Sequence, residues 1–295
     1  MDLTGILGAE PVADAEEEAF LVFSQTIPSH SLGIIDSQAP TLDITVAGYD
    51  LTIHQSRGLL TSDRALGTTG AVLWSITPLF ATWLSLPSNI LTTHDLLTSS
   101  TTVLELGTGI SGILALTLAP RIAHYTATDQ DYVLKLLRHN IAANSAVVFP
   151  RDARQKTGAK GGKSSSKVKV KEKGRGNVRN VMREDRISVQ ALDWETNDVS
   201  HMPPVDMLFA CDCIYNEALI EPLNSTCAAL CRLRQEQGGQ PTLCVIAQQL
   251  RSPEVFETWL KSFCKLFQVW QVPGSMLGEG LGEGSGFVVY VGLVR

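Results

Sequence analysis

The stretch from residue 103 to residue 118 constrains the fold more than any other part of the chain. Residues 103–106, Val-Leu-Glu-Leu, are an apolar run of the kind that forms a short buried strand. Gly107 and Gly109 follow at once, and glycine lets the backbone of a tight turn approach a ligand without an intervening side chain. Residues 110–118 then have the apolar pattern of a helix. A strand, a glycine turn and a helix in this order point backbone N–H groups at a bound group, which predicts a nucleotide-type site in an α/β fold.

A second predicted strand, residues 125–129, ends in Asp129 about twenty residues after the glycines. A carboxylate at this distance is typical of sites that bind the ribose hydroxyls of an adenosine-containing cofactor. Gly107, Gly109 and Gly112 also fit the spacing of dinucleotide sites, so the glycines alone leave the cofactor open. Glu105 favours S-adenosyl-L-methionine, because a carboxylate at the strand end attracts an ammonium and a sulfonium but repels a pyrophosphate. The alternative is that Glu105 is only a surface charge.

Strands that alternate with helices along the rest of the chain predict a mostly parallel sheet with helices on both faces. The predicted strands are residues 103–106, 125–129, 187–190, 206–211, 242–247, 266–272 and 287–293. The predicted helices are residues 71–86, 110–118, 130–144, 218–234 and 253–264. No helix is predicted between the last two strands, so we expect them to pair antiparallel.

The N-terminal part differs from this pattern, so we divide the chain into an extension of residues 1–70 and a domain of residues 71–295. Residues 1–40 show little periodicity. Residues 41–47 and 49–55 alternate apolar with polar side chains, and the two runs meet at a glycine. This arrangement predicts a β-hairpin within the N-terminal extension.

The charge of the chain is unevenly distributed. Residues 151–186 contain 13 of its 24 Lys and Arg residues and 4 of its 30 Asp and Glu residues, which leaves 11 basic and 26 acidic residues elsewhere. Because this segment lacks apolar periodicity, we expect a disordered basic insert between a helix and the next strand. Either it makes a weak RNA contact or acts as a nuclear import signal, or it is a solvated loop. The acidic remainder suits a basic partner.

The six cysteines predict reduced thiols in an intracellular protein, without a metal centre. Cys227 and Cys231 share a helix stripe with leucines, and Cys211 and Cys213 form a Cys-x-Cys pair that fits no usual zinc spacing. The N-terminus has no basic segment of the kind that begins a secretory signal. Residues 72–87 are the longest apolar stretch, but proline and hydroxyl residues interrupt it, so no membrane contact is expected.

Two further groups follow the third and fourth predicted strands, at the same edge of the sheet as the glycine turn. After the third strand come Asp193 and Trp194, and Trp194 offers either a flat face for an adenine ring or ordinary packing. After the fourth strand come Asp212 and Tyr215, which place a carboxylate and a phenol at one pocket mouth. The alternatives for this pair are a helix N-terminal acid and a core tyrosine.

Taken together, these motifs resemble those of the seven-strand lysine methyltransferases. The matching residues are Gly70-Ala71-Val72-Leu73-Trp74, Glu105-Leu106-Gly107-Thr108-Gly109, Asp129, Leu192-Asp193-Trp194 and Asp212-Cys213-Ile214-Tyr215. Residues 45–55, 63–64, 67–70 and 212–217 are also similar to fungal members that methylate a large-subunit ribosomal protein. The resemblance runs from residue 70 to the C-terminus and is interrupted by the basic insert.

This resemblance implies a Rossmann-like class I methyltransferase fold with seven strands, S-adenosyl-L-methionine as cofactor and protein-lysine N-methylation as the activity. The residues to which it gives a cofactor-binding role are Trp74, Glu105, Gly107, Thr108, Gly109, Asp129, Trp194, Ala210 and Cys211. Asp212 and Tyr215 receive catalytic roles, and Cys211 stands where relatives often have alanine. We expect a cytoplasmic monomer that acts on a ribosomal or translation-associated protein.

A lysine ammonium has no lone pair, so it must lose a proton before it can accept a methyl group, and desolvation in a narrow channel favours that loss. We expect Asp212 to orient the incoming ammonium and Tyr215 to shape the mouth. Three other functions stay open: a nucleic-acid methyltransferase that uses the basic insert, a nicotinamide-dependent oxidoreductase, and a non-catalytic protein that kept the fold. The acidic body opposes the first, as do Cys213 and Ile214, which stand where base-methylating enzymes commonly have two prolines.

Overall fold

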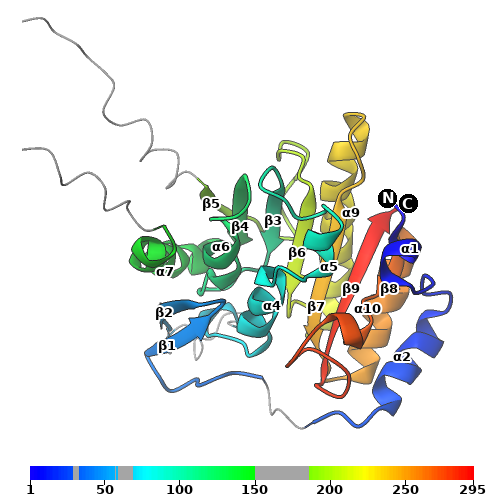
Figure 1. Cartoon of the computed structure of the whole chain (residues 1–295), viewed down its shortest axis with the longest axis horizontal. Helices are drawn as coiled ribbons and strands as arrows, with labels where there is room; N and C mark the ends of the chain where they lie inside the picture. The colour runs from blue at the N-terminus through cyan, green and yellow to red at the C-terminus, as the bar shows by residue number, and fades with distance from the viewer. Residues whose placement is uncertain (29–32, 57, 59–68, 150–185) are drawn as a thin grey trace, which may run out of the picture.

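The computed structural model describes residues 1–28, 33–56, 58, 69–149 and 186–295 (Figure 1). In this part of the chain seven strands form one sheet in the order β5-β4-β3-β6-β7-β9-β8. The strands are β3 (Thr102–Leu106), β4 (His124–Asp129), β5 (Ile187–Ala191), β6 (Met207–Cys211), β7 (Leu243–Gln249), β8 (Phe267–Gln271) and β9 (Phe287–Val294). β3 to β7 are parallel, and β9 lies antiparallel between β7 and β8. The predicted Rossmann-like, mostly parallel sheet with an antiparallel last strand is confirmed.

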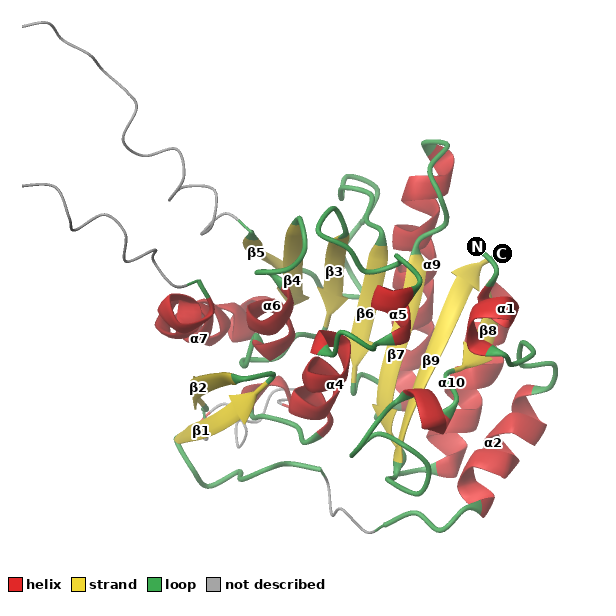
Figure 2. Cartoon of the chain, in the orientation of Figure 1, coloured by secondary structure: helices red, strands yellow, loops and turns green. Residues whose placement is uncertain are grey.

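Helices cover both faces of this sheet (Figure 2). One face packs against α4 (Ile76–Ser85), α6 (Ile113–Leu118) and α7 (Asp131–Val148), and the other against α9 (Ile220–Glu236), α10 (Pro253–Leu266) and α2 (Ala15–Ser24). Because side chains alternate along a strand, Phe209 and Cys211 of β6 enter the core of the first set of helices, whereas Leu208 and Ala210 enter the core of the second.

Several helices begin or end away from their predicted positions. The helix predicted over residues 71–86 is reduced to α4, because the chain before it forms a 3-10 turn at residues 69–71 and an isolated β-bridge between Trp74 and Ile34. The helix predicted from residue 110 begins at Ile113, because Gly109 and Gly112 hold left-handed backbone angles that a helix cannot contain.

The N-terminal segment is more regular than its sequence pattern indicates. It contains α1 (Leu3–Leu7) and α2, neither of which was predicted. α2 begins where the Asp14 carboxylate accepts the backbone N–H groups of Glu16 and Glu17, an N-cap reinforced by acidic residues in the first turn. Further short helices in the described part of the chain are α5 (Ile90–Thr93) and the 3-10 turns Thr69–Ala71, Glu217–Leu219 and Gly274–Met276.

The predicted β-hairpin is confirmed as β1 (Thr41–Val46) and β2 (Tyr49–His54), which pair antiparallel. Ala47 and Gly48 both have positive φ at the turn, as a two-residue hairpin loop requires. The free edge of β2 lies against α7, where the side-chain amide of Asn144 exchanges two hydrogen bonds of 2.9 Å with the backbone of Thr52. Asn140 does the same with the backbone of His54, also at 2.9 Å, and donates to the carbonyl of Ile110 at 2.7 Å.

Residues 150–185 lie outside the described part of the chain, and the prediction of a disordered insert concerns these residues. Residues 63–64 and 67–68, which belong to the family resemblance, also lie outside it. The described residues on either side of residues 150–185 end α7 and begin β5, at the amino-terminal edge of the parallel strands. Among the helices that the structure describes, none combines the length and apolarity needed to cross a bilayer.

Candidate active site

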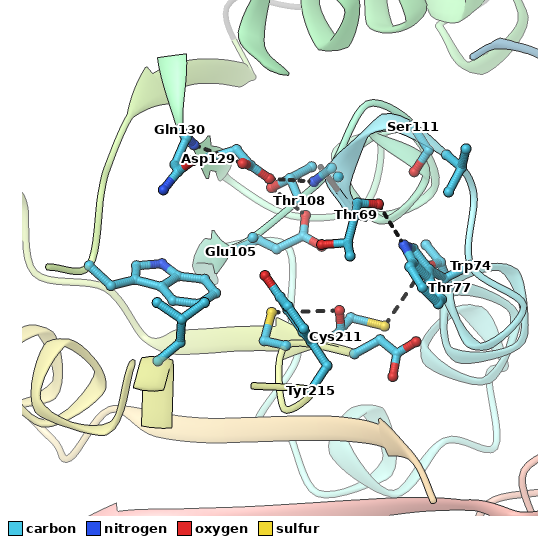
Figure 3. Close-up of a pocket in the computed structure, with 18 of the residues that line it drawn as sticks. Thr69, Trp74, Thr77, Glu105, Thr108, Ser111, Asp129, Gln130, Cys211 and Tyr215 are labelled. Atoms are coloured by element: carbon cyan, nitrogen blue, oxygen red, sulfur yellow. Dashed lines mark hydrogen bonds between the residues drawn. The ribbon is translucent and has the colours of Figure 1, made fainter. Parts of the chain in front are cut away.

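A pocket of about 330 Å³ opens at the carboxyl ends of β3, β4 and β6 (Figure 3). Ligands of open α/β sheets bind at this edge, where loops from neighbouring strands converge. Ten of the eleven residues singled out from the sequence line the pocket: Trp74, Glu105, Gly107, Thr108, Gly109, Asp129, Trp194, Cys211, Asp212 and Tyr215. The volume is in the range of pockets that enclose a cofactor-sized molecule.

Ala210 is the exception. It belongs to β6, but its side chain is fully buried among the side chains of α9 and α10, on the face of the sheet away from the pocket. Its neighbour Cys211 is the residue that reaches the pocket, because adjacent strand residues point to opposite faces. The Ala210 side chain therefore does not line the pocket, and the cofactor-binding role that the resemblance implies for this residue stays a prediction.

The glycine turn after β3 forms the floor of the pocket. Gly107 has a φ of +65°, and a Cβ added to it would lie 2.7 Å from the Sγ of Cys213 and 3.1 Å from the Trp194 ring. Gly109, with a φ of +64°, donates its backbone N–H to Asp129 at 2.7 Å. The two glycines thus line the pocket with backbone atoms, and the turn is fixed to the end of the next strand.

Glu105 is buried at the end of β3, 2% exposed, and its Oε2 accepts hydrogen bonds from the hydroxyls of Tyr125 at 2.8 Å and Thr108 at 3.0 Å. Burial raises the pKa of Glu105 from 4.5 to about 7, although the two hydrogen bonds lower it. Figure 3 places this carboxyl group between Asp129 and Tyr215. The alternative of an exposed surface charge is excluded, because Glu105 is a buried acid that a cationic ligand would ionise.

Asp129 ends β4 and is half-buried at the pocket wall. Its two oxygens accept the backbone N–H groups of Gly109 and Gln130, each at 2.7 Å. Burial raises the pKa of Asp129 to about 6, against the lowering effect of these two N–H donors. These two hydrogen bonds fix the orientation of the Asp129 carboxylate beside the glycine turn, at the wall of the pocket.

Trp194 forms the flat, apolar side of the pocket. Its ring lies over Gly107, and the thiol of Cys213 packs below the same turn and contacts the carbonyl of Leu106 at 3.4 Å. Burial raises the pKa of the Cys213 and Cys211 thiols well above the ordinary value, so both are neutral. An indole face beside two neutral thiols suits a planar, uncharged ring.

Asp212 follows β6 in a left-handed conformation, with a φ of +61°, and both of its carboxylate oxygens accept hydrogen bonds. Arg251 binds it in a bidentate pair, with Nη1–Oδ1 and Nη2–Oδ2 distances of 2.7 and 2.6 Å. The Nε2 of Gln248 donates to Oδ1 at 3.0 Å, and the backbone N–H of Gln249 at 3.3 Å. The sequence indicated a carboxylate here but not the cation that balances it.

Arg251 was missed although its position carries a signal. It comes two residues after the end of β7, at the same edge of the sheet as the other pocket residues. Its guanidinium lies 5.1 Å from the ring centre of Trp74, whose Nε1 donates to the carbonyl of Thr69 at 2.9 Å. Further lining residues that the motifs did not single out include Thr77, Ser111, Gln130 and Tyr132.

Tyr215 lies at the open side of the pocket and is 38% exposed. Partial burial raises the pKa of its phenol, although a side-chain hydrogen bond with Thr69 lowers it. Tyr215 is therefore a neutral hydrogen-bonding group at the open side of the pocket.

Comparison with known proteins agrees with this geometry. A family model described as "Lysine methyltransferase" matches residues 53–156 and 168–263. Ribosomal lysine N-methyltransferase 5 of Zygosaccharomyces rouxii is 33% identical over 72% of this chain and 70% of its own length. The protein of that name from Eremothecium gossypii is 28% identical over 79% and 81% of the two chains.

Two other matches are more distant or partial. A Schizosaccharomyces pombe protein named diaminohydroxyphosphoribosylamino-pyrimidine deaminase is 28% identical over 88% of this chain, which spans 53% of that relative. Among solved structures, a tRNA (uracil-54, C5)-methyltransferase of Pyrococcus abyssi with S-adenosyl-L-homocysteine aligns at a TM-score of 0.41 and 12% identity, over 87% and 45% of the two chains. We draw no argument from this structural likeness.

The family match covers most of the chain and includes all the strand-end motifs. The chain therefore belongs to the lysine methyltransferase family.

Proposed function

We propose that this protein transfers a methyl group from S-adenosyl-L-methionine to a lysine side chain of a large-subunit ribosomal protein. The observation that carries the proposal is the single pocket in which Glu105, Asp129 and Trp194 surround the glycine turn while Asp212 and Tyr215 stand at the open side. The inner residues suit a cationic adenosine cofactor, and the outer ones suit an amine.

The inner pocket fits the cofactor by its chemistry. Asp129 would hold the ribose hydroxyls, because its carboxylate already faces the turn and can accept two hydroxyl donors. Trp194 would lie against the adenine, and the absence of a side chain at Gly107 lets the indole and the Cys213 thiol pack closely on the turn. Glu105 would face the cationic methionine part. When bound, the cofactor supplies a sulfonium methyl group, which an uncharged amine nitrogen accepts.

The outer pocket orients the nucleophile. A lysine side chain reaches the pocket past the half-exposed Tyr215, whose phenol can accept or donate a hydrogen bond. Asp212 lines the pocket together with Tyr215, and its carboxylate can accept an N–H of the amine. Holding the nitrogen in line with the methyl group would supply a large part of the rate by positioning alone.

The substrate class is supported by the relatives named for ribosomal lysine methylation and by charge. Outside residues 151–186 the chain carries 11 basic and 26 acidic residues, and proteins that bind ribosomal RNA are basic. We propose that the enzyme works as a monomer in the cytoplasm, where translation takes place. A weak RNA contact through residues 151–186 would help it engage a ribosomal particle.

The test is to incubate the purified protein and methyl-labelled S-adenosyl-L-methionine with large ribosomal subunits from a fungal strain that lacks the enzyme. We expect label on a lysine of one ribosomal protein, mapped by peptide mass spectrometry as an added methyl group. The same assay on stripped ribosomal proteins and on ribosomal RNA separates the alternatives. Label on the RNA alone would replace the proposal with nucleic-acid methylation, and label on neither would reject it.

A further inference from the structure

We propose that Arg251 is a positioning residue for the transfer reaction: it balances the charge of Asp212, so that the substrate lysine can release its proton to water at the open, solvent-exposed mouth of the pocket before its nitrogen accepts the methyl group. This inference rests on the proposed function, because it concerns how the same pocket treats an amine. Asp212 alone would be a poor partner for the reaction. A lone carboxylate attracts an ammonium, but it also stabilises the protonated form that cannot accept a methyl group.

The structure holds the two charges in a fixed relation. Each oxygen of Asp212 accepts one N–H of the guanidinium, at 2.7 and 2.6 Å, in the bidentate geometry that suits an arginine and a carboxylate. The Asp212 side chain is only 2% exposed and the Arg251 side chain 20%. A pair this sheltered differs from a surface salt bridge, which water screens.

Two neighbouring side chains hold Arg251 in place. Its guanidinium lies against Trp74, and its Nη2 donates to the Oε1 of Gln249 at 2.9 Å. The backbone of Gly33 passes nearby, since a Cβ built on it would lie 3.0 Å from Nη2. These contacts keep the positive charge beside Asp212 when the substrate side chain arrives.

Arg251 is the one basic side chain that lines the pocket in the described part of the chain. The other titratable groups that face this space are Glu105, Asp129, Tyr132, Asp193, Cys211, Cys213 and Tyr215. Glu105 and Asp129 lie at the cofactor side, and the thiols are neutral. At the substrate side, therefore, the balance between Asp212 and Arg251 decides whether the site favours an ammonium or an amine.

Asp212 keeps one acceptor position for the substrate. Its Oδ1 accepts three N–H groups, whereas Oδ2 accepts only that of Arg251 among the interactions of the described residues. Each carboxylate oxygen has two lone pairs, so the three donors on Oδ1 share its two, whereas Oδ2 keeps one for a further donor. An uncharged lysine nitrogen can thus donate to Oδ2 without meeting a net negative charge.

The experiment measures kcat and KM for the ribosomal substrate from pH 6.5 to 10 in the full-length protein and in the variants Arg251→Gln, Arg251→Lys and Asp212→Asn/Arg251→Gln. In Arg251→Gln the pH midpoint of kcat should rise by about one unit or more, so that kcat falls about tenfold near pH 7.5 and recovers at high pH. Its KM for the substrate should not rise. Arg251→Lys should keep the midpoint, and the double variant should move it back towards the wild-type value because the charges balance again.

Arg234→Gln is the matched control, since it breaks another Asp–Arg pair, with Asp206 at the opposite end of β6. Its pH profile should equal that of the wild type, and S-adenosyl-L-homocysteine should bind all variants equally in calorimetry. If Arg251→Gln is slower by the same factor at every pH, or if the double variant is as displaced as the single one, the inference is wrong while the proposed function stands. If the wild type methylates no lysine at all, the proposed function fails and takes the inference with it.

Discussion

β6 carries an aspartate paired with an arginine at each of its ends, and the two pairs are built differently. Before the strand, Asp206 binds Arg234 at 2.5 Å, and both side chains are 26% exposed. The Asp206 carboxylate also accepts the backbone N–H and the hydroxyl of Thr102, each at 2.7 Å, which ties β6 to β3. After the strand, the Asp212 side chain is buried, its backbone is left-handed, and its partner Arg251 faces the pocket.

An aspartate–arginine pair thus links strands at the amino edge of the sheet, whereas at the carboxyl edge the same kind of pair lines the pocket. A non-glycine residue at positive φ costs on the order of 1–3 kcal/mol, which the surrounding contacts of Asp212 must offset. Asp206 has no such strain, and its partial exposure limits what its ion pair contributes. Substitutions at the carboxyl edge should therefore change binding and transfer, whereas matched ones at the amino edge should change stability alone.

The largest effect is expected for Gly107→Ala. The new Cβ would lie 2.7 Å from the Cys213 thiol and 3.1 Å from Trp194, so the turn or the indole must move. We expect the affinity for S-adenosyl-L-homocysteine to fall by about 100-fold or more in calorimetry, since displacing the floor and the flat wall removes most of the pocket contacts. Gly238→Ala at the amino edge is the control, because Gly238 also has a positive φ of +73° but nothing lies within 4 Å of an added Cβ. Equal affinity losses in both variants would mean that backbone strain alone is responsible.

The next effect is that of Asp212→Asn on transfer. The amide cannot hold Arg251 with two oxygens, and the unbalanced guanidinium would repel the protonated side chain that enters. We expect the rate of methyl transfer to fall about 100-fold, while S-adenosyl-L-homocysteine binds within about twofold of the wild type. Asp206→Asn should leave transfer unchanged, so a similar rate in the two variants would remove Asp212 from the reaction.

A smaller effect, of opposite sign for stability and for binding, is expected for Glu105→Gln. The folded-state pKa of Glu105 is raised from 4.5 to about 7, so its protonation stabilises the ligand-free protein below about pH 4.5, and this contribution is lost as the pH rises through about 7. At pH 8 the neutral glutamine should raise the free energy of unfolding by about 1–3 kcal/mol in urea titrations, with little difference at pH 5.

The same variant should bind S-adenosyl-L-methionine about tenfold more weakly at pH 8, because a cationic ligand gains from the ionised acid. In the wild type, affinity should rise with pH through the range from about 6 to about 7, where Asp129 and Glu105 ionise. Glu236→Gln, an exposed substitution at the end of α9, serves as the amino-edge control. A pH-independent affinity in the wild type would contradict the assignment of Glu105 to the cationic part of the cofactor.

The smallest effect is expected for Arg234→Gln. This ion pair is partly exposed at both partners, and such pairs contribute at most about 1 kcal/mol. The free energy of unfolding should therefore drop by less than about 1 kcal/mol, with no change in cofactor affinity. If Arg234→Gln lowered the free energy of unfolding as much as Arg251→Gln does, the two ion pairs would contribute equally to stability.

The sequence predicted the sheet well because its central strands are short apolar runs that follow turn signals, as at residues 103–106 and 206–211. It predicted most pocket residues because strand-end motifs of parallel strands meet at one edge. α1 and α2 were missed because they are stabilised by contacts with elements distant in sequence, which local periodicity does not report. In α2, for example, Glu18 accepts a hydrogen bond from the Tyr290 hydroxyl of β9 at 2.7 Å.

The gaps in the predicted site have similar causes. The family resemblance gives Ala210 and Cys211 the same role, although alternation along β6 lets only the Cys211 side chain reach the pocket. Arg251 was missed because no motif includes it, and its role depends on the three-dimensional meeting of the ends of β6 and β7. The raised pKa of Glu105 depends on burial, which a single sequence does not report for a charged residue.

The contact between β2 and α7 has a consequence for attempts to shorten the chain. Four helical residues advance by about 6 Å and two strand residues by about 7 Å, so Asn144 and Asn140 can act as successive rungs of a ladder beside Thr52 and His54. A helix thereby closes one edge of the hairpin to strand addition. Asn140 also donates to the carbonyl of Ile110, which directly follows the glycine turn. A truncation that removes the hairpin would therefore remove partners that fix the Asn140 side chain, and would weaken the support of the glycine turn.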